Sequence, residues 1–160
     1  MRRKDREVTD FEQIKKIVQN SHVIRMGINT DDYPYVVPTN FGYEFDGDQL
    51  TLYIHGAPVG TKRELIAKNP HIGFEMDDGG EYMSPEEAKS ETPSYAYQSV
   101  MGNGDASFIE DTQGKIQALQ HILIHETGHK MEHLPEKDVA YVGIIKIVVK
   151  SLTGKVHFKN

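Results

Sequence analysis

Apolar residues at helical spacing mark three segments of the chain. After Asp10, whose carboxylate can cap a helix, such spacing predicts a short amphipathic helix over residues 10–20. A second apolar stripe, within residues 116–126, ends just before Gly128, and glycine suits a helix C-terminus. Residues 60–69 are predicted as a third helix, because the proline that follows them disfavours its continuation.

Runs of Val, Ile, Tyr and Phe between turn residues predict β-strands. The predicted strands are residues 22–28, 35–43, 50–55, 71–76, 94–109 and 139–149, the last followed by a turn at 152–155. Short breaks rich in Asn, Asp and Gly separate the first three, which are therefore expected to form an antiparallel meander. Pro38 cannot donate to a ladder and is expected at a bulge or an edge. Gly102 and Gly104 predict a bend or bulge in their strand.

These elements together predict the fold class. Residues 77–93 are acidic, hold few apolar anchors and are predicted to form a long loop. About six strands with two or three helices predict a mainly β protein, a small antiparallel barrel with helices at its periphery. The chain of 160 residues shows no internal repeat, so one domain over residues 1–160 is expected.

Composition excludes several classes of function. The chain has no cysteine, which rules out thiolate catalysis, iron–sulfur clusters and disulfides. With 24 acidic against 18 basic residues, no nucleic-acid binding is expected. No apolar run approaches the roughly 18 residues of a membrane span, and no signal-peptide core follows the basic start, which predicts a soluble, cytoplasmic protein without membrane contact. Residues 75–91 hold seven acids and one base and so account for the whole formal charge of −6.

One motif resembles a zinc site. Residues 125–129 read His-Glu-Thr-Gly-His and match the H-E-x-x-H pattern, in which two histidines share a helix face and the glutamate acts as a base. Thr127 and Gly128 are poor residues for a helix interior, so the helix is expected to end inside the motif. A zinc hydrolase using His125, Glu126 and His129 is therefore kept only as an alternative.

A second motif predicts an anion site. Glycines at positions 56 and 60 follow a strand, and Thr61, Lys62 and Arg63 begin the next predicted helix. Backbone N–H groups, a hydroxyl and two cations then converge at one place. The spacing is too short for a phosphate-binding P-loop, and the alternative is a solvated helix start with incidental charges.

The order of these motifs resembles a known family. The segments that carry the resemblance are residues 34–43, 52–57, 60–62, 69–70, 97–104 and 125–128, with the basic opening at 2–7. In this order they resemble the FMN-binding split barrels related to pyridoxamine 5'-phosphate oxidase, most closely the nitroimidazole-resistance (Nim-like) branch. The resemblance implies a six-stranded split β-barrel that forms a homodimer, with FMN at the subunit interface.

The resemblance also implies where FMN binds. The flavin ring is expected to be lined by Val37, Pro38, Thr39 and Asn40, and the ring and ribityl chain to be flanked by Tyr53, Ile54 and His55. The phosphate is expected to be held by Thr61 and Lys62, with Arg63. The other chain is expected to close the site through Gln98, Ser99 and Val100. Where pyridoxamine phosphate oxidases carry an Arg-Lys pair, this chain has Thr61-Lys62, so activity on that vitamin is not expected.

A flavin explains why no catalytic triad is recognisable. The cofactor brings its own redox chemistry, and the protein need supply only binding, orientation and electrostatics. The expected function is an FMN-dependent, nitroreductase-like oxidoreductase that passes electrons from a reduced nicotinamide donor to a small acceptor. His55, at a strand end beside the anion site, is the candidate catalytic residue; its alternative is a structural histidine bonded to a carbonyl. The other alternative for the whole protein is flavin or haem binding without catalysis.

Overall fold

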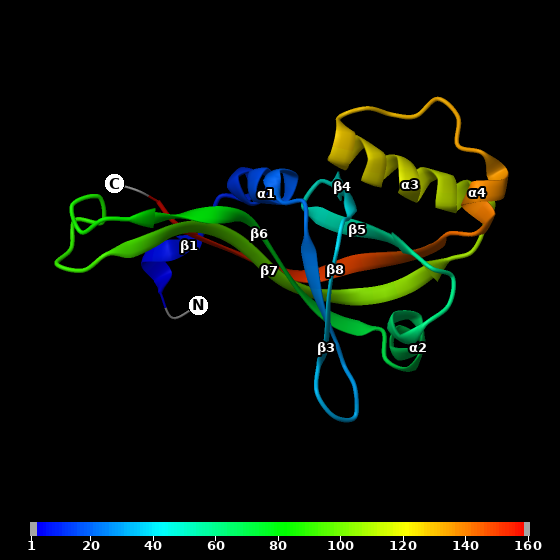
Figure 1. Ribbon diagram of the computed structural model, residues 1–160, viewed down its shortest axis with the longest axis horizontal. Coiled ribbons are helices and arrows are strands. Elements are labelled where there is room, and N and C mark those ends of the chain that lie inside the picture. The colour runs from blue at the N-terminus through cyan, green and yellow to red at the C-terminus, as the bar shows by residue number, and fades with distance from the viewer. Residues whose placement is uncertain (1–2, 159–160) are drawn as a thin grey trace.

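The alternation of buried and exposed residues along the strands produces one strongly curved antiparallel sheet with helices outside it (Figure 1). The computed structural model describes residues 3–158. In chain order the elements are the 3₁₀ turn η1 (Lys4–Arg6), β1 (Glu7–Val8), α1 (Phe11–Asn20), β2 (Ile24–Ile28), β3 (Tyr35–Thr39), β4 (Gly42–Asp46), β5 (Gln49–Gly56), α2 (Thr61–Lys68), β6 (His71–Met83), β7 (Ser94–Ile109), α3 (Thr112–Thr127), α4 (Glu136–Ala140) and β8 (Gly143–His157).

The strand order makes the sheet a split barrel. The order is β3-β2-β6-β7-β8-β5-β4, with β1 added to β8, and every pair is antiparallel. The two end strands, β3 and β4, are separated along the chain only by Asn40 and Phe41. The two ends of the sheet therefore meet at this corner, although β3 and β4 do not pair with each other. The fold is mainly β and antiparallel as predicted, with eight strands in place of six.

The barrel interior is filled from alternate positions of the strands. In β2 the buried residues are Ile24, Met26 and Ile28, while the residues between them face outward. Phe41, at the corner between β3 and β4, is 0% exposed and belongs to the same cluster. The corner is thus anchored by a large side chain in the core, not by strand pairing.

Helix α3 covers the outer face of β4 and β5. Asp111 caps its start by accepting a hydrogen bond from the Gly114 N–H, and Gly128 ends it with φ of +74°. A Cβ at Gly42 would collide with the backbone of His121 and Ile122, so α3 crosses β4 at a position where only glycine fits. The lack of a side chain at Gly42 sets how closely the helix packs.

The predicted helices are confirmed, and so are two details of the strands. Pro38 lies on the edge strand β3, where it faces Arg25 of β2. The ladder between β7 and β8 shifts register between Asn103 and Gly104, as the two glycines of β7 predicted. The described chain has no helix long and apolar enough to cross a membrane.

Other expectations about the strands were wrong. Residues 35–43 form two strands that belong to opposite ends of the sheet, so there is no three-stranded meander. The predicted loop at 77–93 is shorter, because β6 continues to Met83 through a register shift after Asp77. β8 likewise runs through the turn predicted at 152–155. These extensions pair by backbone hydrogen bonds while exposing much of both faces, and they show no regular apolar alternation.

The close approach of α3 to β4 gives a first prediction. Gly42→Ala is expected to lower the free energy of unfolding by about 1–3 kcal/mol, because the added methyl forces the helix away from the sheet. Asp46→Ala, at an exposed position of the same strand, is the control. Urea unfolding followed by circular dichroism measures both. Equal stability of the two variants would contradict the packing described here.

Candidate functional site

The start of α2 holds a half-buried cation without a counter-ion. The Lys62 side chain folds back toward the end of β5, where a Cβ at Gly56 would lie 3.5 Å from Lys62 Nζ. Burial lowers the pKa of Lys62, and no carboxylate in residues 3–158 pairs with it. The lack of a side chain at Gly56 makes room for the ammonium group. An anionic ligand is the partner that this group lacks.

The first turn of α2 adds further donors. Gly60 precedes the helix with φ of +122° and offers no side-chain cap. Its carbonyl accepts from the N–H groups of Arg63 and Glu64, so the preceding two N–H groups of the turn point out of the helix without a backbone partner. Together with the exposed Thr61 hydroxyl and the Lys62 ammonium, these groups form the predicted anion site.

Arg63 is held apart from this site by contacts to Phe108 in β7 and to Glu110, which follows β7. Its Nη2 lies 2.6 Å from the Glu110 carboxylate, and the guanidinium packs over the Phe108 ring at 4.0 Å. The side chain is 14% exposed. Lys62 is therefore the uncommitted cation of the Lys62-Arg63 pair.

Strand β3 presents one unpaired edge. It pairs with β2 alone, so the backbone groups along its other side have no ladder partner. Val37 and Thr39 are half-buried, while Pro38 and Asn40 are exposed. Val36 is also exposed, at 61%. The open edge offers main-chain groups and small side chains, which suits a flat ligand.

The three predicted residues of β5 lie in different surroundings. Ile54 is 0% exposed inside the barrel. Tyr53 lies under α3, where its hydroxyl donates to Glu44 at 2.9 Å and its ring stacks on His121 at 5.0 Å; burial, and then Glu44, raise its pKa to about 12. Only the main chain of these two residues can contact a ligand. The His55 side chain is exposed and has no hydrogen-bond partner among the described residues, so it is not a structural histidine tied to a carbonyl.

The predicted residues of β7 also differ from one another in burial and in contacts. The Gln98 amide donates to Asp78 at 2.7 Å, and burial raises the pKa of Asp78. Ser99 is half-buried, whereas Val100 is fully buried in the core. Of this group, Gln98 and Ser99 have side chains that a second molecule can reach.

The zinc-like motif has a structural role. Nδ1 of His125 lies 2.8 Å from the Phe41 carbonyl oxygen and Nε2 lies 3.1 Å from that of Gln19, so the ring ties α3 to the β3–β4 corner and to α1. The helix ends at Thr127, as expected, before His129. Residues 3–158 contain no group of three or more side chains placed to hold a metal ion. The zinc alternative has no support.

Sequence reasoning missed one cavity. It has a volume of about 650 Å³ and lies between the ends of α1 and α3. Its lining consists of Gln19, Asn20, His22, Tyr43, His121, Ile124, His125 and Gly128. The four-residue spacing of His121 and His125 is the only sequence signal that points to it.

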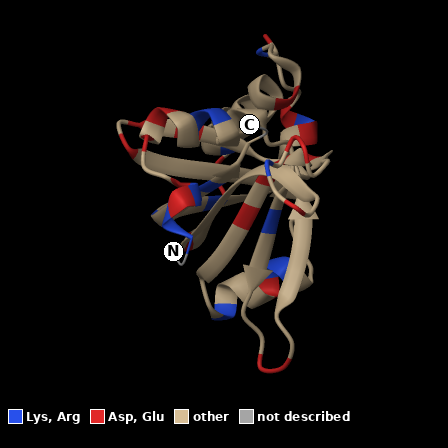
Figure 2. Cartoon of the chain, turned by 90° about the vertical axis from the view of Figure 1, so that its left-hand side faces the viewer, with Lys and Arg blue, Asp and Glu red and all other residues tan. Residues whose placement is uncertain are grey.

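Charge does not segregate into a large basic face. Acidic and basic residues are interspersed over the elements, as Figure 2 shows, and Arg25 on β2 pairs with Glu75 at 3.0 Å and Asp77 at 2.7 Å on β6. The absence of nucleic-acid binding stays a prediction that agrees with this distribution.

Comparisons with known proteins cover nearly the whole chain. The model of the pyridoxamine 5'-phosphate oxidase family matches residues 10–156. No curated protein matches. Among solved structures, a candidate 5-nitroimidazole antibiotic resistance protein from Bacteroides thetaiotaomicron is 32% identical with a TM-score of 0.80, over 94% of this chain and 86% of that one.

Two more distant structures share the fold. The flavocytochrome Anf3 from Azotobacter vinelandii is 20% identical with a TM-score of 0.76, over 99% of this chain and 72% of that one. A FAD- and haem-binding protein from Mycobacterium smegmatis is 15% identical with a TM-score of 0.80, over 97% of this chain and 76% of that one. At these identities the likeness extends to the fold alone.

The structural role of His125 gives a second prediction. His125→Ala is expected to lower the free energy of unfolding by about 1–3 kcal/mol, because it leaves the Phe41 carbonyl without its donor. His129→Ala is expected to change it by less than about 0.5 kcal/mol. Denaturant unfolding compares the two, with and without a zinc chelator. A chelator that destabilised the wild-type protein would restore the metal interpretation.

Proposed function

Because the chain belongs to the pyridoxamine 5'-phosphate oxidase family, we propose that it is an FMN-dependent oxidoreductase that works as a homodimer in the cytoplasm. The flavin phosphate binds at the start of α2, and the flavin ring lies along the free edge of β3. The electrons come from a reduced nicotinamide and pass to a small acceptor such as a nitroaromatic compound.

The observation that carries the proposal is the unpaired Lys62 ammonium. FMN brings a phosphate dianion, which supplies the counter-charge that no residue of the described chain provides. The Thr61 hydroxyl and the N–H groups of the first turn of α2 add hydrogen bonds to the same group. In this proposal Arg63 keeps its ion pair with Glu110.

A second subunit completes the site in this proposal. Gly27 and Gly73 face each other on adjacent strands, on the outer side of the sheet, and neither glycine is required by a positive φ or by a close contact. They leave a strip of bare backbone on which another chain can lie closely. Val36, 61% exposed, and Met101, 43% exposed, add apolar surface. Gln98 and Ser99 of the partner subunit would then close over the flavin.

The reaction needs few groups from the protein. The bound flavin supplies the redox chemistry. The open edge of β3 supplies main-chain groups that orient the ring, and His55, which has no internal partner, is free to bind the acceptor. The candidate 5-nitroimidazole resistance protein among the similar structures supports the choice of a nitroaromatic acceptor.

The phosphate assignment gives a third prediction. Lys62→Ala is expected to weaken FMN binding roughly 10- to 100-fold, because a charge-assisted contact to the phosphate is lost. Lys68→Ala, on the exposed last turn of the same helix, is expected to change it less than about twofold. Quenching of flavin fluorescence measures both affinities.

Riboflavin, which lacks the phosphate, is the ligand control. Its affinity should be the same for the wild type and for Lys62→Ala. If FMN bound both proteins equally well, or if riboflavin binding fell as much as FMN binding, the phosphate would not lie at Lys62.

The role of His55 gives a fourth prediction. His55→Ala is expected to keep FMN affinity within about threefold of the wild type while lowering kcat/KM for the acceptor by roughly 10- to 100-fold. His133→Ala, on an exposed loop, is the control. The measurement is anaerobic reduction by NADH or NADPH, followed by reoxidation with a nitroimidazole. If the bound flavin were reduced no faster than free FMN, the proposed catalysis would be contradicted. The protein would then be a flavin-binding protein without this activity, which is the alternative to the proposal.

A further inference from the structure

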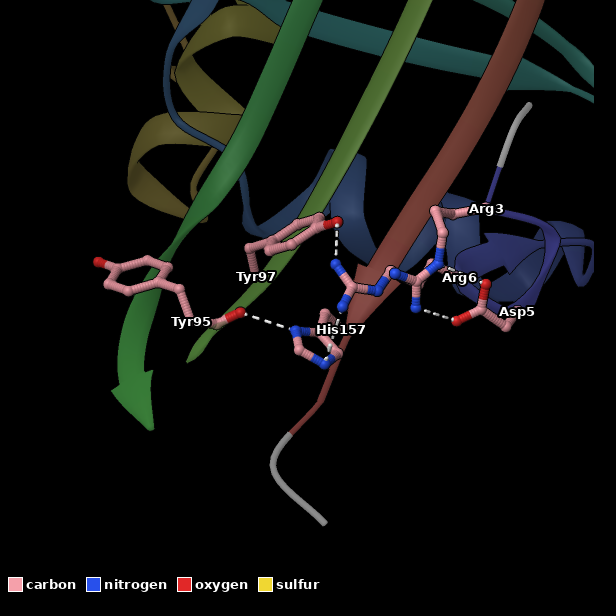
Figure 3. A network of polar contacts seen from close by, with 6 residues as sticks. All are labelled: Arg3, Asp5, Arg6, Tyr95, Tyr97 and His157. Atoms are coloured by element: carbon pink, nitrogen blue, oxygen red, sulfur yellow. Dashed lines mark hydrogen bonds and ion pairs between the residues drawn. The ribbon is translucent and has the colours of Figure 1, made fainter. Parts of the chain in front are cut away.

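A cluster of polar side chains lies at the end of the sheet remote from α2. Figure 3 shows Arg6, from η1, reaching across β8 to Tyr97 of β7: Nη1 donates to the Tyr97 hydroxyl at 3.4 Å, and Nη2 lies 3.3 Å from Nε2 of His157. On the same side, Nζ of Lys155 lies 5.3 Å from the centre of the Tyr97 ring. We call Arg6, Tyr97, Lys155 and His157 the Arg6–Lys155 cluster.

The hydrogen-bond partners of His157 indicate which of its ring nitrogens carries the proton. Its Nδ1 lies 2.9 Å from the Tyr95 carbonyl oxygen, which can only accept, so Nδ1 carries the proton. Its Nε2 faces the Arg6 guanidinium, which can only donate, so Nε2 accepts. The imidazole is therefore neutral in this arrangement. Neither partner of the Arg6 guanidinium carries a negative charge while the Tyr97 phenol is protonated.

The two cations of the cluster lack counter-ions. Neither Arg6 nor Lys155 has a carboxylate within ion-pair distance anywhere in residues 3–158. The neighbouring Arg3 differs, because it is paired with Asp5 at 2.6 Å. Arg6 also has a buried Nε without any acceptor. In a chain with a net charge of −6, two cations that both contact Tyr97 and form no ion pair are a feature that the fold does not explain.

The pKa of Tyr97 reflects the positive charges beside it. Burial raises the pKa of its phenol, but hydrogen bonds and charge from Lys155 and Arg6 outweigh that effect and leave the pKa below its ordinary value. A phenol with a lowered pKa is the group expected where an anion is favoured.

The acids nearby lie on both sides of Tyr97. Glu7 of β1 is the cross-strand neighbour of Lys155, although no ion pair joins the two side chains. A cavity of about 250 Å³ next to Tyr97 and His157 is lined on its β6 side by Asp78 and Glu81. Asp78 accepts from Gln98 at 2.7 Å, and burial raises its pKa. The favourable position for negative charge is therefore between Arg6 and Lys155 at the Tyr97 hydroxyl, away from β6.

We propose that the Arg6–Lys155 cluster binds a doubly charged oxyanion of the phosphate type, either free phosphate or the phosphate group of a small ester. Arg6 and Lys155 supply the two positive charges, and the Arg6 guanidinium and the Tyr97 hydroxyl supply donors. Within one chain this site lies on other elements than Lys62, and in the proposed dimer it borders the surface of Ser99, the cross-strand neighbour of Lys155.

The test measures phosphate binding by NMR in the Lys62→Gln protein, in which the anion site of α2 is disabled. Inorganic phosphate and phenyl phosphate are titrated in turn at constant ionic strength, with acetate and chloride as comparison anions. The ¹H–¹⁵N signals of the Arg6 Nε–Hε group and of the Tyr97 amide are followed. Both phosphates should shift them saturably, and acetate should bind at least about tenfold more weakly. Phenyl phosphate binding tighter than inorganic phosphate would identify an ester as the ligand class.

Variants decide whether the cluster is responsible. Lys155→Gln and Arg6→Gln should each weaken phosphate binding roughly tenfold or more, while Tyr97→Phe should retain most of it and Lys130→Gln, at an exposed position, all of it. The Lys155 side chain is half-buried and contacts Tyr97, which lies outside the hydrophobic core, so Lys155→Gln carries the test if Arg6→Gln unfolds. Shifts that do not saturate or that chloride reproduces would overturn the proposal, as would saturable binding that survives Lys155→Gln.

Discussion

Two residues, Asn40 and Phe41, join the two end strands of the sheet, and this short link determines much of the architecture. Two residues span at most about 10 Å with their flanking bonds, so the sheet must curl until its ends meet. Phe41 is 0% exposed and fixes the corner in the core. The Asn40 side chain donates to the His22 carbonyl at 3.1 Å, and His125 holds the Phe41 carbonyl at 2.8 Å. The barrel is closed by side chains at this corner and stays split elsewhere.

The same constraint positions the site. Because β3 and β4 meet at the corner but do not pair with each other, one edge of β3 keeps its backbone groups available. Helix α3 covers β4 and β5 on one side of the corner, and α2 begins beyond the end of β5 (Figure 1). The open edge and the unpaired Lys62 ammonium are the features that a flavin phosphate cofactor needs, and neither serves the stability of the barrel.

Much of this could be predicted from the sequence, for reasons that differ between elements. The helices follow from apolar spacing and from Asp10 and Gly128 at their ends, and the anion site follows from residue types that keep their chemistry in any fold. The corner could be predicted only in part. Asn40 and Gly42 are residues typical of turns, but the change of strand there depends on the burial of Phe41 and on the contact of Gly42 with α3, which sequence spacing does not encode. The placement of Tyr53 beneath α3, and the difference between Lys62 and Arg63, depend on tertiary contacts to Glu44 and Glu110 that sequence spacing does not encode.

A crystal structure of the protein with FMN tests the central claim most directly. The account predicts the flavin phosphate within hydrogen-bonding distance of Lys62 Nζ and the first turn of α2, with the ring along the free edge of β3 and Gln98 and Ser99 of a second subunit beside it. A flavin found instead in the cavity between α1 and α3, or bound to a monomer without contact to Lys62, would contradict it.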